Sequence, residues 1–359
     1  MKKYYFILSN FLRVNYKSLK SLTNFSIIIS TMLCVVFISI TLSITDGFKK
    51  NIISKIIFFD GYARVEYSDL NKKDLSFILN NDNNISPYYE SQYIVKSNND
   101  SELITLFSSN SIKEKITNIV ILPNVNKSNG VYLGLGLKNK LFMNDSSNLS
   151  AILISDSEMF KNINILGFFE TGVPLFDNHV IVSNISDLSF YEDIPDGYII
   201  DQEIFNEIDD SFTSYIRTYE DRYYDFLKWL SSYDLPIFIL LSFILIVGLI
   251  NNKFCYTIDL INRYKDSFIL HNLGLSRNEI HYLYFLKFLI LNIIGIFLGT
   301  IISLLLLYLE LQFNFIQIPS DIYFTSSVPI IFKFQNFIYA PLIILLQAFY
   351  FAISKHELK

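Results

Sequence analysis

The sequence predicts an α-helical membrane protein with four transmembrane helices and one large α+β domain on the extracytoplasmic (periplasmic) side. Four apolar stretches, at residues 24–45, 236–255, 282–309 and 336–354, each approach the ~20 residues that a helix needs to cross a hydrocarbon core of ~30 Å. Residues 46–235, between the first and second stretches, are too polar to lie in lipid and long enough to fold as a domain. This spacing favours a protein that couples the two faces of a membrane over a soluble enzyme.

Composition and charge support this division of the chain. The 359 residues are 51% hydrophobic with a mean hydropathy of +0.35, which fits a mixture of membrane-spanning and water-exposed parts. Residues 49–235 hold 27 acidic against 16 basic residues, whereas the rest of the chain is basic on balance. Because nucleic-acid binding depends on basic surface that neutralises phosphates, the acidic domain argues against nucleic acid as a partner.

The distribution of lysine and arginine predicts the orientation of the spans. Basic residues without an acidic one precede the first span, and the loop between the second and third spans is also basic. By the positive-inside rule, residues 1–23 and 256–281 are cytoplasmic, while 46–235 and the loop at 310–335 are periplasmic. Both termini, including the tail at 355–359, are then cytoplasmic. The residues that decide this are Lys2, Lys3, Arg13, Lys17, Lys20, Lys253, Arg263, Lys265, Arg277 and Lys333.

The segment before the first span has its own pattern. Residues 4–22 mix Tyr, Phe and Leu with Arg and Lys, which predicts an amphipathic helix at the cytoplasmic interface, with a disordered basic tail as the alternative. The first apolar stretch is too long for a signal peptide, starts too far from the N-terminus and lacks an Ala-x-Ala-like site. We therefore expect it to remain as a transmembrane helix.

Residues 46–235 are predicted to form a single α+β domain, because short strand-like runs are mixed with helical patterns. Helices are predicted at 69–79, 134–142 and 185–191. From about Tyr215 to the second span we predict one unbroken helix, either a stiff lever between domain and membrane or a solvated helix end. The strand-like runs lie at 62–67, 88–95, 102–107, 150–154, 162–169, 179–183 and 196–200.

The sequence contains no catalytic constellation. It has no Gly-x-x-x-x-Gly-Lys-Ser/Thr loop, so we expect it to bind no ATP itself. Cys34 and Cys255 fall in the first two spans, where they are expected to pack as small hydrophobes, and the polar domain has no cysteine for a disulfide. The four histidines are scattered without a metal-ligand spacing. We predict a non-enzymatic chain that holds no cofactor or metal.

The loop between the second and third spans is predicted to be structured. Its apolar residues recur at helical spacing, as a short amphipathic helix requires: Ile258, Ile261, Ile269, Leu270 and Leu273. Gly274 suits the left-handed position after a helix, and Ser276 with Glu279 forms a capping-box pattern. Two helices that meet at a tight turn make a rigid knob, which can dock in a partner's groove and carry force into the third span. An ordinary loop helix resting on the membrane is the alternative.

Four segments carry a recognisable family pattern. They are SITDGF at 43–48, NILGFFETG at 164–172 followed by Phe176-Asp177, RYKD at 263–266 continuing through Leu270 to Leu273-Gly274, and IPSDIYF at 318–324 followed by Val328-Pro329. In these segments, and along nearly its whole length, the chain resembles the lipoprotein-releasing ABC transporter permeases (LolC/LolE type) of the MacB/FtsX-like permease family. The second and fourth segments, in that order, are more specific to the lipoprotein-releasing branch.

The resemblance implies a multi-pass permease subunit of the bacterial inner membrane that extracts lipoproteins for transfer toward the outer membrane. The implied partners are a cytoplasmic ABC ATPase that binds ATP and Mg²⁺, a second permease chain in a homo- or heterodimer, the lipoprotein substrate and a periplasmic lipoprotein carrier. The implied ATPase contact comprises Arg263, Asp266, Ile269, Leu270, Leu273 and Gly274. The first span and its dimer partner would flank a lateral opening for acyl chains, with Val36, Ile40, Ser43 and Phe48 as lipid or lipoprotein contacts.

One departure from the family pattern keeps other functions open. Only residues 155–160 separate two strand-like runs where one branch of the family carries a protruding hairpin that recruits the carrier. The C-terminus is also shorter than the family's usual ending, but this does not weaken the resemblance. A MacB-like efflux permease or an FtsX-like mechanotransmission permease would use the same fold on another periplasmic client. A membrane-anchored sensor or hydrolase without an ATPase also fits the bare topology, although the loop pattern and the missing catalytic set oppose it.

Overall fold

The computed structural model describes residues 19–80, 85–97, 100–109, 130–141, 149–153, 160–183, 194–208, 212–318 and 327–353. The chain divides into two compact units. We call residues 1–48, 231–317 and 327–359 the helical unit, and residues 49–230 with 318–326 the sheet unit. The two units are described separately below.

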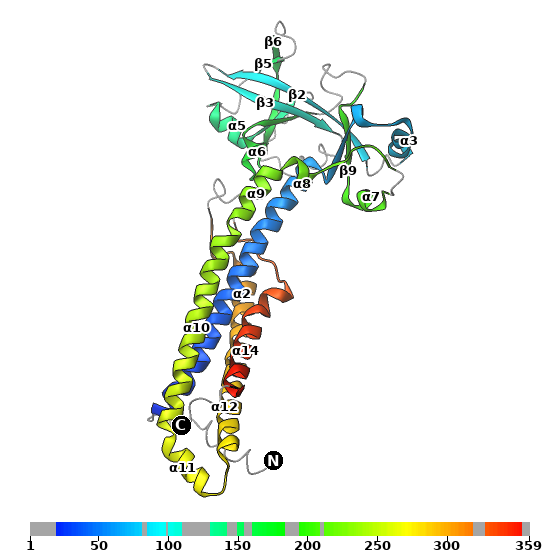
Figure 1. Cartoon of the computed structure of the whole chain (residues 1–359). Helices are drawn as coiled ribbons and strands as arrows, with labels where there is room; N and C mark the ends of the chain where they lie inside the picture. Colours follow the sequence, from blue (N-terminus) through cyan, green and yellow to red (C-terminus); the bar gives the residue numbers. More distant parts are fainter. Residues whose placement is uncertain are drawn as a thin grey trace. The chain divides into compact units, whose positions relative to one another are not determined.

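Four helices of the described chain are long and apolar enough to cross a membrane: Leu22–Asp60, Tyr224–Asn262, Arg277–Phe313 and Phe334–Phe351. They correspond to α2 (Leu19–Asp60), α9 (Tyr224–Ser232) with α10 (Asp234–Asn262), α12 (Arg277–Phe313), and the short η3 (Phe334–Phe337) with α14 (Tyr339–Ile353). In the helical unit, α2, α10, α12 and α14 run lengthwise beside one another (Figure 1). The four apolar helices fit the predicted fold class, while the membrane boundaries along them stay predictions.

Helix α2 is longer than a membrane span requires. Its 42 residues extend over about 63 Å at 1.5 Å per residue, roughly twice a hydrocarbon core. The residues up to Phe48 belong to the helical unit and those from Lys49 to the sheet unit. The first apolar stretch is therefore the first part of a helix that continues into the polar region.

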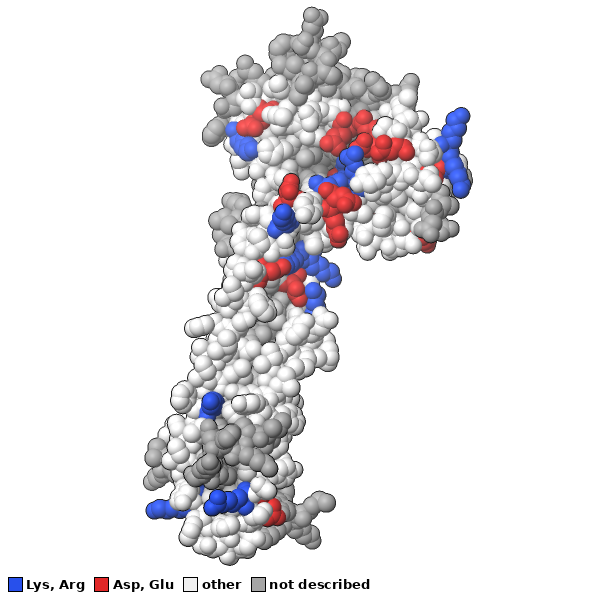
Figure 2. All heavy atoms as spheres, in the orientation of Figure 1, with Lys and Arg blue, Asp and Glu red and all other residues white. Residues whose placement is uncertain are grey.

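Close packing between α2 and α12 depends on two glycines one helical turn apart. A Cβ atom at Gly295 would lie 2.9 Å from the carbonyl oxygen of Ile28, and a Cβ at Gly299 would lie 2.9 Å from that of Met32. Gly295-Ile-Phe-Leu-Gly299 is a Gly-x-x-x-Gly motif, which lets the backbones of two membrane helices approach closely. On the face seen in Figure 2, a broad band along the helical unit carries no Lys, Arg, Asp or Glu, as a lipid-facing surface requires.

The described strands of the sheet unit form a mixed sheet of ten strands. Eight strands follow the order β10-β1-β9-β2-β3-β8-β4-β7, and β5 pairs with β2 and with β6. β3 with β8 and β4 with β7 are parallel pairs, and the others are antiparallel. The strands are β1 (Ala63–Glu66), β2 (Ile85–Ser97), β3 (Asp100–Ser109), β4 (Val131–Gly134), β5 (Leu149–Leu153), β6 (Phe160–Ile163), β7 (Ile165–Phe169), β8 (Val180–Ser183), β9 (Gly197–Ile200) and β10 (Arg217–Thr218).

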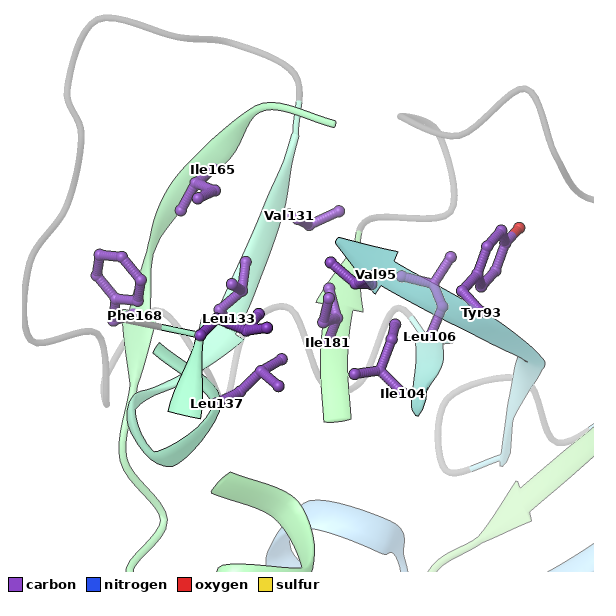
Figure 3. Packing of buried hydrophobic residues seen from close by; sticks show 11 residues of the cluster. Tyr93, Val95, Ile104, Leu106, Val131, Leu133, Leu137, Ile165, Phe168 and Ile181 are labelled. Carbon is purple, nitrogen blue, oxygen red and sulfur yellow. The ribbon is translucent and has the colours of Figure 1, made fainter. Parts of the chain in front are cut away.

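Short helices and apolar clusters complete the sheet unit. The helices are α3 (Lys72–Asn80), α5 (Leu135–Lys140), α6 (Pro174–Asp177), α7 (Gln202–Glu207) and α8 (Tyr219–Arg222), with the 3-10 turn η1 (Tyr67–Asp69). One cluster packs β2, β3, β4, β7 and β8 against α5, with Leu133, Leu137 and Ile181 fully buried (Figure 3). Burial of a residue of this kind stabilises the fold by ~1.5–3 kcal/mol. The sheet-containing region fits the predicted α+β class.

Most predicted elements of the sheet unit are present, with three corrections. The run at 162–169 is two strands, because β6 pairs with β5 while β7 pairs with β4. β4 and β10 were not predicted. The helix expected from Tyr215 is not unbroken: β10 comes first, and the helical stretch is then interrupted at Tyr223 and Tyr233. The segments at 4–18, 185–191, 319–324 and 355–359 lie outside the described residues.

Candidate functional site

The loop between α10 and α12 is held by a buried carboxylate. Asp259, near the end of α10, is 4% exposed. Its Oδ1 accepts a hydrogen bond of 3.0 Å from Nε of Arg263, and its Oδ2 pairs with the ammonium group of Lys287 on α12. Thr23 of α2 also donates to Oδ1, at 3.4 Å. One carboxylate therefore links three apolar helices and the first residue of the loop.

The loop itself is a short helix between two well-formed caps. The predicted helix over 258–274 is divided at Arg263, where α10 ends and α11 (Tyr264–Asn272) begins. Gly274 has a φ of +92°, its N–H bonds to the carbonyl of His271, and the N–H of Leu275 bonds to that of Leu270, which is a Schellman motif. Ser276 and Glu279 form the predicted capping box. The predictions for both caps are confirmed.

The predicted ATPase-contact residues separate into an exposed and an inward set. Ile269 and Leu273 are 57% and 67% exposed, and Gly274 is exposed as well. Asp266 is half-buried, Leu270 packs against the apolar core of the helical unit, and Arg263 is buried. The exposed apolar surface of α11 also includes residues that the prediction left out, Tyr264 and Phe268. A partner would meet Ile269 and Leu273 directly, whereas Arg263 and Leu270 face the chain's own core.

A second polar layer joins the same three helices. Thr31 of α2 donates to Oδ1 of Asn292 on α12 at 2.9 Å, and Nδ2 of Asn252 on α10 lies 3.2 Å from the same oxygen and 3.3 Å from Thr31. All three side chains are at most 1% exposed. Polar groups inside a helix bundle in lipid are expensive unless they pair, so layers of this kind specify which helices meet and in which register.

The predicted lipid contacts on α2 mostly face inward. Val36 is 8% exposed and Ser43 is fully buried, while Ile40 and Phe48 are half-buried. In the described part of this helix that belongs to the helical unit, the exposed large apolar side chains are Leu33 and Phe37, together with Leu22 and Phe25 near its start. Helical periodicity was a usable signal for this face, because these positions are separated by 3, 8 and 4 residues, which is about one or two helical turns.

Two of the motifs that carry the family resemblance have structural roles. The carboxylate of Asp177 accepts 2.8 Å hydrogen bonds from the N–H groups of Thr171 and Gly172 and from the Thr171 hydroxyl, which closes the turn after β7. Burial tends to raise the pKa of Asp177 and these hydrogen bonds tend to lower it. Burial is the larger effect, so the pKa is raised. The turn places the ring of Phe176 4.3 Å from that of Phe59, at the end of α2.

The other motif is the exit from the first span. Asp46 accepts hydrogen bonds from Nδ2 of Asn336 at 3.0 Å and from Nζ of Lys333 at 3.1 Å. A Cβ atom at Gly47 would overlap the carbonyl group of Pro329. Asp46-Gly47 therefore seats α2 against the segment that leads into α14.

The sheet unit contains a cavity of about 420 Å³ with charged and aromatic walls. Arg64 and Arg222 both pair with Asp60, and Arg64 also pairs with Glu90 at 3.0 Å. Burial disfavours the charge of Arg64, but the carboxylates of Asp60 and Glu90 outweigh it and raise its pKa; for Arg222, burial prevails and lowers the pKa. The Arg64 guanidinium lies over the rings of Tyr88 and Phe107, 4.5 and 4.4 Å from their centres.

This cluster was missed at the level of the sequence. Its members come from the end of α2, from β1 and β2 and from α8. They are far apart in the sequence, so no short sequence pattern predicts that they meet. The acidic and basic side chains of this cluster pair with one another. These ion pairs can hold the elements together, which is a structural role that requires no reactive group. The lining residues are Phe59, Asp60, Arg64, Glu66, Tyr88, Glu90, Thr105, Phe107, Leu175, Phe176, Val180, Arg217, Arg222 and Tyr223.

Comparison with known proteins gives one distant similarity that covers both units. No protein-family model matches the chain. The chain is 22% identical over 354 residues to the "lipoprotein-releasing system transmembrane protein LolC" of Buchnera aphidicola subsp. Schizaphis graminum (strain Sg), and the match covers 88% of this chain and 87% of that protein. Since neither unit alone amounts to 88% of the chain, the similarity extends over the helical unit and the sheet unit together.

Proposed function

We propose that this chain is the permease subunit of an ABC transporter that extracts lipoproteins from the bacterial inner membrane, driven by ATP hydrolysis in a partner subunit. The observation that carries the proposal is the similarity to the LolC protein over 88% of this chain, whose described residues form four apolar helices with one large polar region between the first two. We assign no catalytic residue to the chain, and ATP and Mg²⁺ belong to the partner.

The loop helix α11 is the contact we assign to the ATPase. Its exposed apolar residues Ile269 and Leu273 suit an apolar groove in a partner, since removal of apolar surface from water favours association. The two caps of the loop make it rigid enough to transmit a push into α12. A second permease chain, the lipoprotein substrate and a periplasmic carrier complete the proposed assembly.

Co-purification of the tagged chain in mild detergent tests the ATPase contact. We expect an ATPase to accompany the wild-type chain and to be lost with Ile269→Asp, because a carboxylate in an apolar groove costs several kcal/mol. Asn278→Asp introduces the same side chain at an exposed site in the first turn of α12 and should leave co-purification intact. Leu270→Asp is a poor probe, because this side chain packs in the chain's own core.

A release assay tests the cargo. Membranes that contain the chain and its ATPase should release a labelled lipoprotein when ATP is added, while Ile269→Asp membranes should not. Failure of wild-type membranes, beside a positive control that succeeds, would exclude lipoprotein release. If the chain binds an ATPase but releases no lipoprotein, an efflux or mechanotransmission permease is indicated. If no ATPase co-purifies with the wild-type chain or with any variant, a membrane-anchored sensor is indicated.

A further inference from the structure

We propose that Asp259 is the positioning residue of the α10–α12 loop: its carboxylate sets the direction in which α11 follows α10. The loop's role as an ATPase contact rests on the proposed function above, whereas the positioning concerns contacts within this chain alone. Measurements on this chain alone, without a partner, therefore test the inference.

The carboxylate is built into the helical unit from three sides. It pairs with Arg263, the first residue of the loop, and with Lys287 of α12, and it accepts a hydrogen bond from Thr23 of α2. Asp259, Arg263 and Lys287 are 4%, 5% and 1% exposed, so water screens these charges little. A carboxylate with several oxygen lone pairs can accept all of these donors at once.

Arg263 passes this anchoring on to α11. Its carbonyl oxygen accepts the N–H of Ser267 at 2.9 Å, the hydroxyl of Ser267 at 3.2 Å and the hydroxyl of Tyr284 at 3.3 Å. The two hydroxyl groups also lie 2.8 Å apart. The first turn of α11 is thus tied to α12 through a residue whose side chain is held by Asp259.

The charged side chain of Asp259 can fix the orientation of α11, which apolar packing alone cannot do. Apolar contacts have no preferred direction, so they do not by themselves fix the angle at which α11 follows α10. Hydrogen bonds to a carboxylate have a direction, and they select one arrangement of the three helices and the loop. The exposed α11 face, including Ile269 and Leu273, then projects in one orientation rather than several.

Hydrogen–deuterium exchange of the full-length chain in detergent tests the inference. Asp259→Asn keeps the size of the side chain but turns an N–H₂ donor toward Arg263 or Lys287. We expect amides of 264–275 to exchange at least about tenfold faster, while those of β2 and β3 keep wild-type rates. Asp259→Glu retains the carboxylate and should restore most of the protection, which a purely volume-dependent role would not allow.

Lys287→Met is the matched control. It removes a buried charge from the same cluster but leaves the Asp259–Arg263 pair, so α11 should stay protected. If Asp259→Asn does not fold, the Asp259→Asn/Lys287→Met variant replaces it, because that variant contains no buried lysine opposite the amide. Wild-type exchange in 264–275, or an equal rise throughout the chain, would overturn the positioning role. Faster exchange in Asp259→Asn, with no ATPase accompanying the wild-type chain, would support the positioning role and count against the proposed function only.

Discussion

At the scale of single residues, one carboxylate of the sheet unit makes stability depend on pH. Asp74 of α3 is 2% exposed, and its Oδ2 accepts hydrogen bonds from the hydroxyl and N–H of Ser214 at 2.6 and 2.9 Å and from the N–H of Thr213 at 3.1 Å. Burial tends to raise the pKa of Asp74, but these hydrogen bonds, led by the Ser214 hydroxyl, outweigh it and lower the pKa. The ionised form is therefore the one that stabilises the fold.

Asp74→Asn should lower the free energy of unfolding at neutral pH by about 1–3 kcal/mol. A carboxyl whose folded pKa is lowered contributes stability above its unfolded pKa, near 3.9, and loses it as pH falls through the folded value. The difference in the free energy of unfolding between wild type and Asp74→Asn should therefore become smaller as the pH is lowered. Thermal unfolding of the full chain in detergent at pH 7 and pH 3.5 measures both effects. Exposed Asp69→Asn should change little at either pH, and an equal loss for the two variants would contradict the argument.

At the scale of elements, the Gly295–Gly299 face of α12 decides how closely α2 packs. Gly295→Leu would push a side chain into the α2 backbone at Ile28, at a cost of about 1–3 kcal/mol or more for overpacking. We expect a lower thermal midpoint and increased trypsin cleavage of the solubilised chain. Ile294→Leu places the same side chain on the exposed face one position earlier and should behave as wild type. Equal midpoints for Gly295→Leu and wild type would mean that the two helices do not pack in this way.

Also at this scale, the accuracy of the sequence-based predictions depended on how local the signal was. The caps around α11 and the strands β2, β3, β8 and β9 were predicted, because capping boxes, glycine and alternating apolar residues act within a few neighbours. The break at Arg263 was not predicted, because it depends on contacts to Asp259 and Tyr284, the latter on another helix. Likewise, the burial of Val36 and Leu270 follows from what packs over them, which an apolar pattern does not specify.

At the scale of the whole molecule, the predicted topology places the sheet unit and the α10–α12 loop on opposite sides of the membrane. In a chain with Cys34→Ala and Cys255→Ala, a cysteine introduced at Asp69 should react with a membrane-impermeant maleimide in spheroplasts. A cysteine introduced at Asn278 should react only after permeabilisation. Both positions are exposed in the structure, so a difference in labelling reports sidedness and not burial. Reaction of both, or the opposite order, would refute a periplasmic sheet unit and a cytoplasmic α11.

The sequence by itself determined the division of this protein: four apolar helices, one polar α+β region, and a capped loop between α10 and α12. These features follow from composition and short-range periodicity, which act before any tertiary contact forms. Only the tertiary structure decided which polar residues meet. Asp259 with Arg263 and Lys287, Thr31 with Asn252 and Asn292, and Asp60 with Arg64 and Arg222 bring together side chains up to 261 positions apart. The physical reason is that a buried polar group must find its partner in space, and its position in the chain does not say where that partner lies.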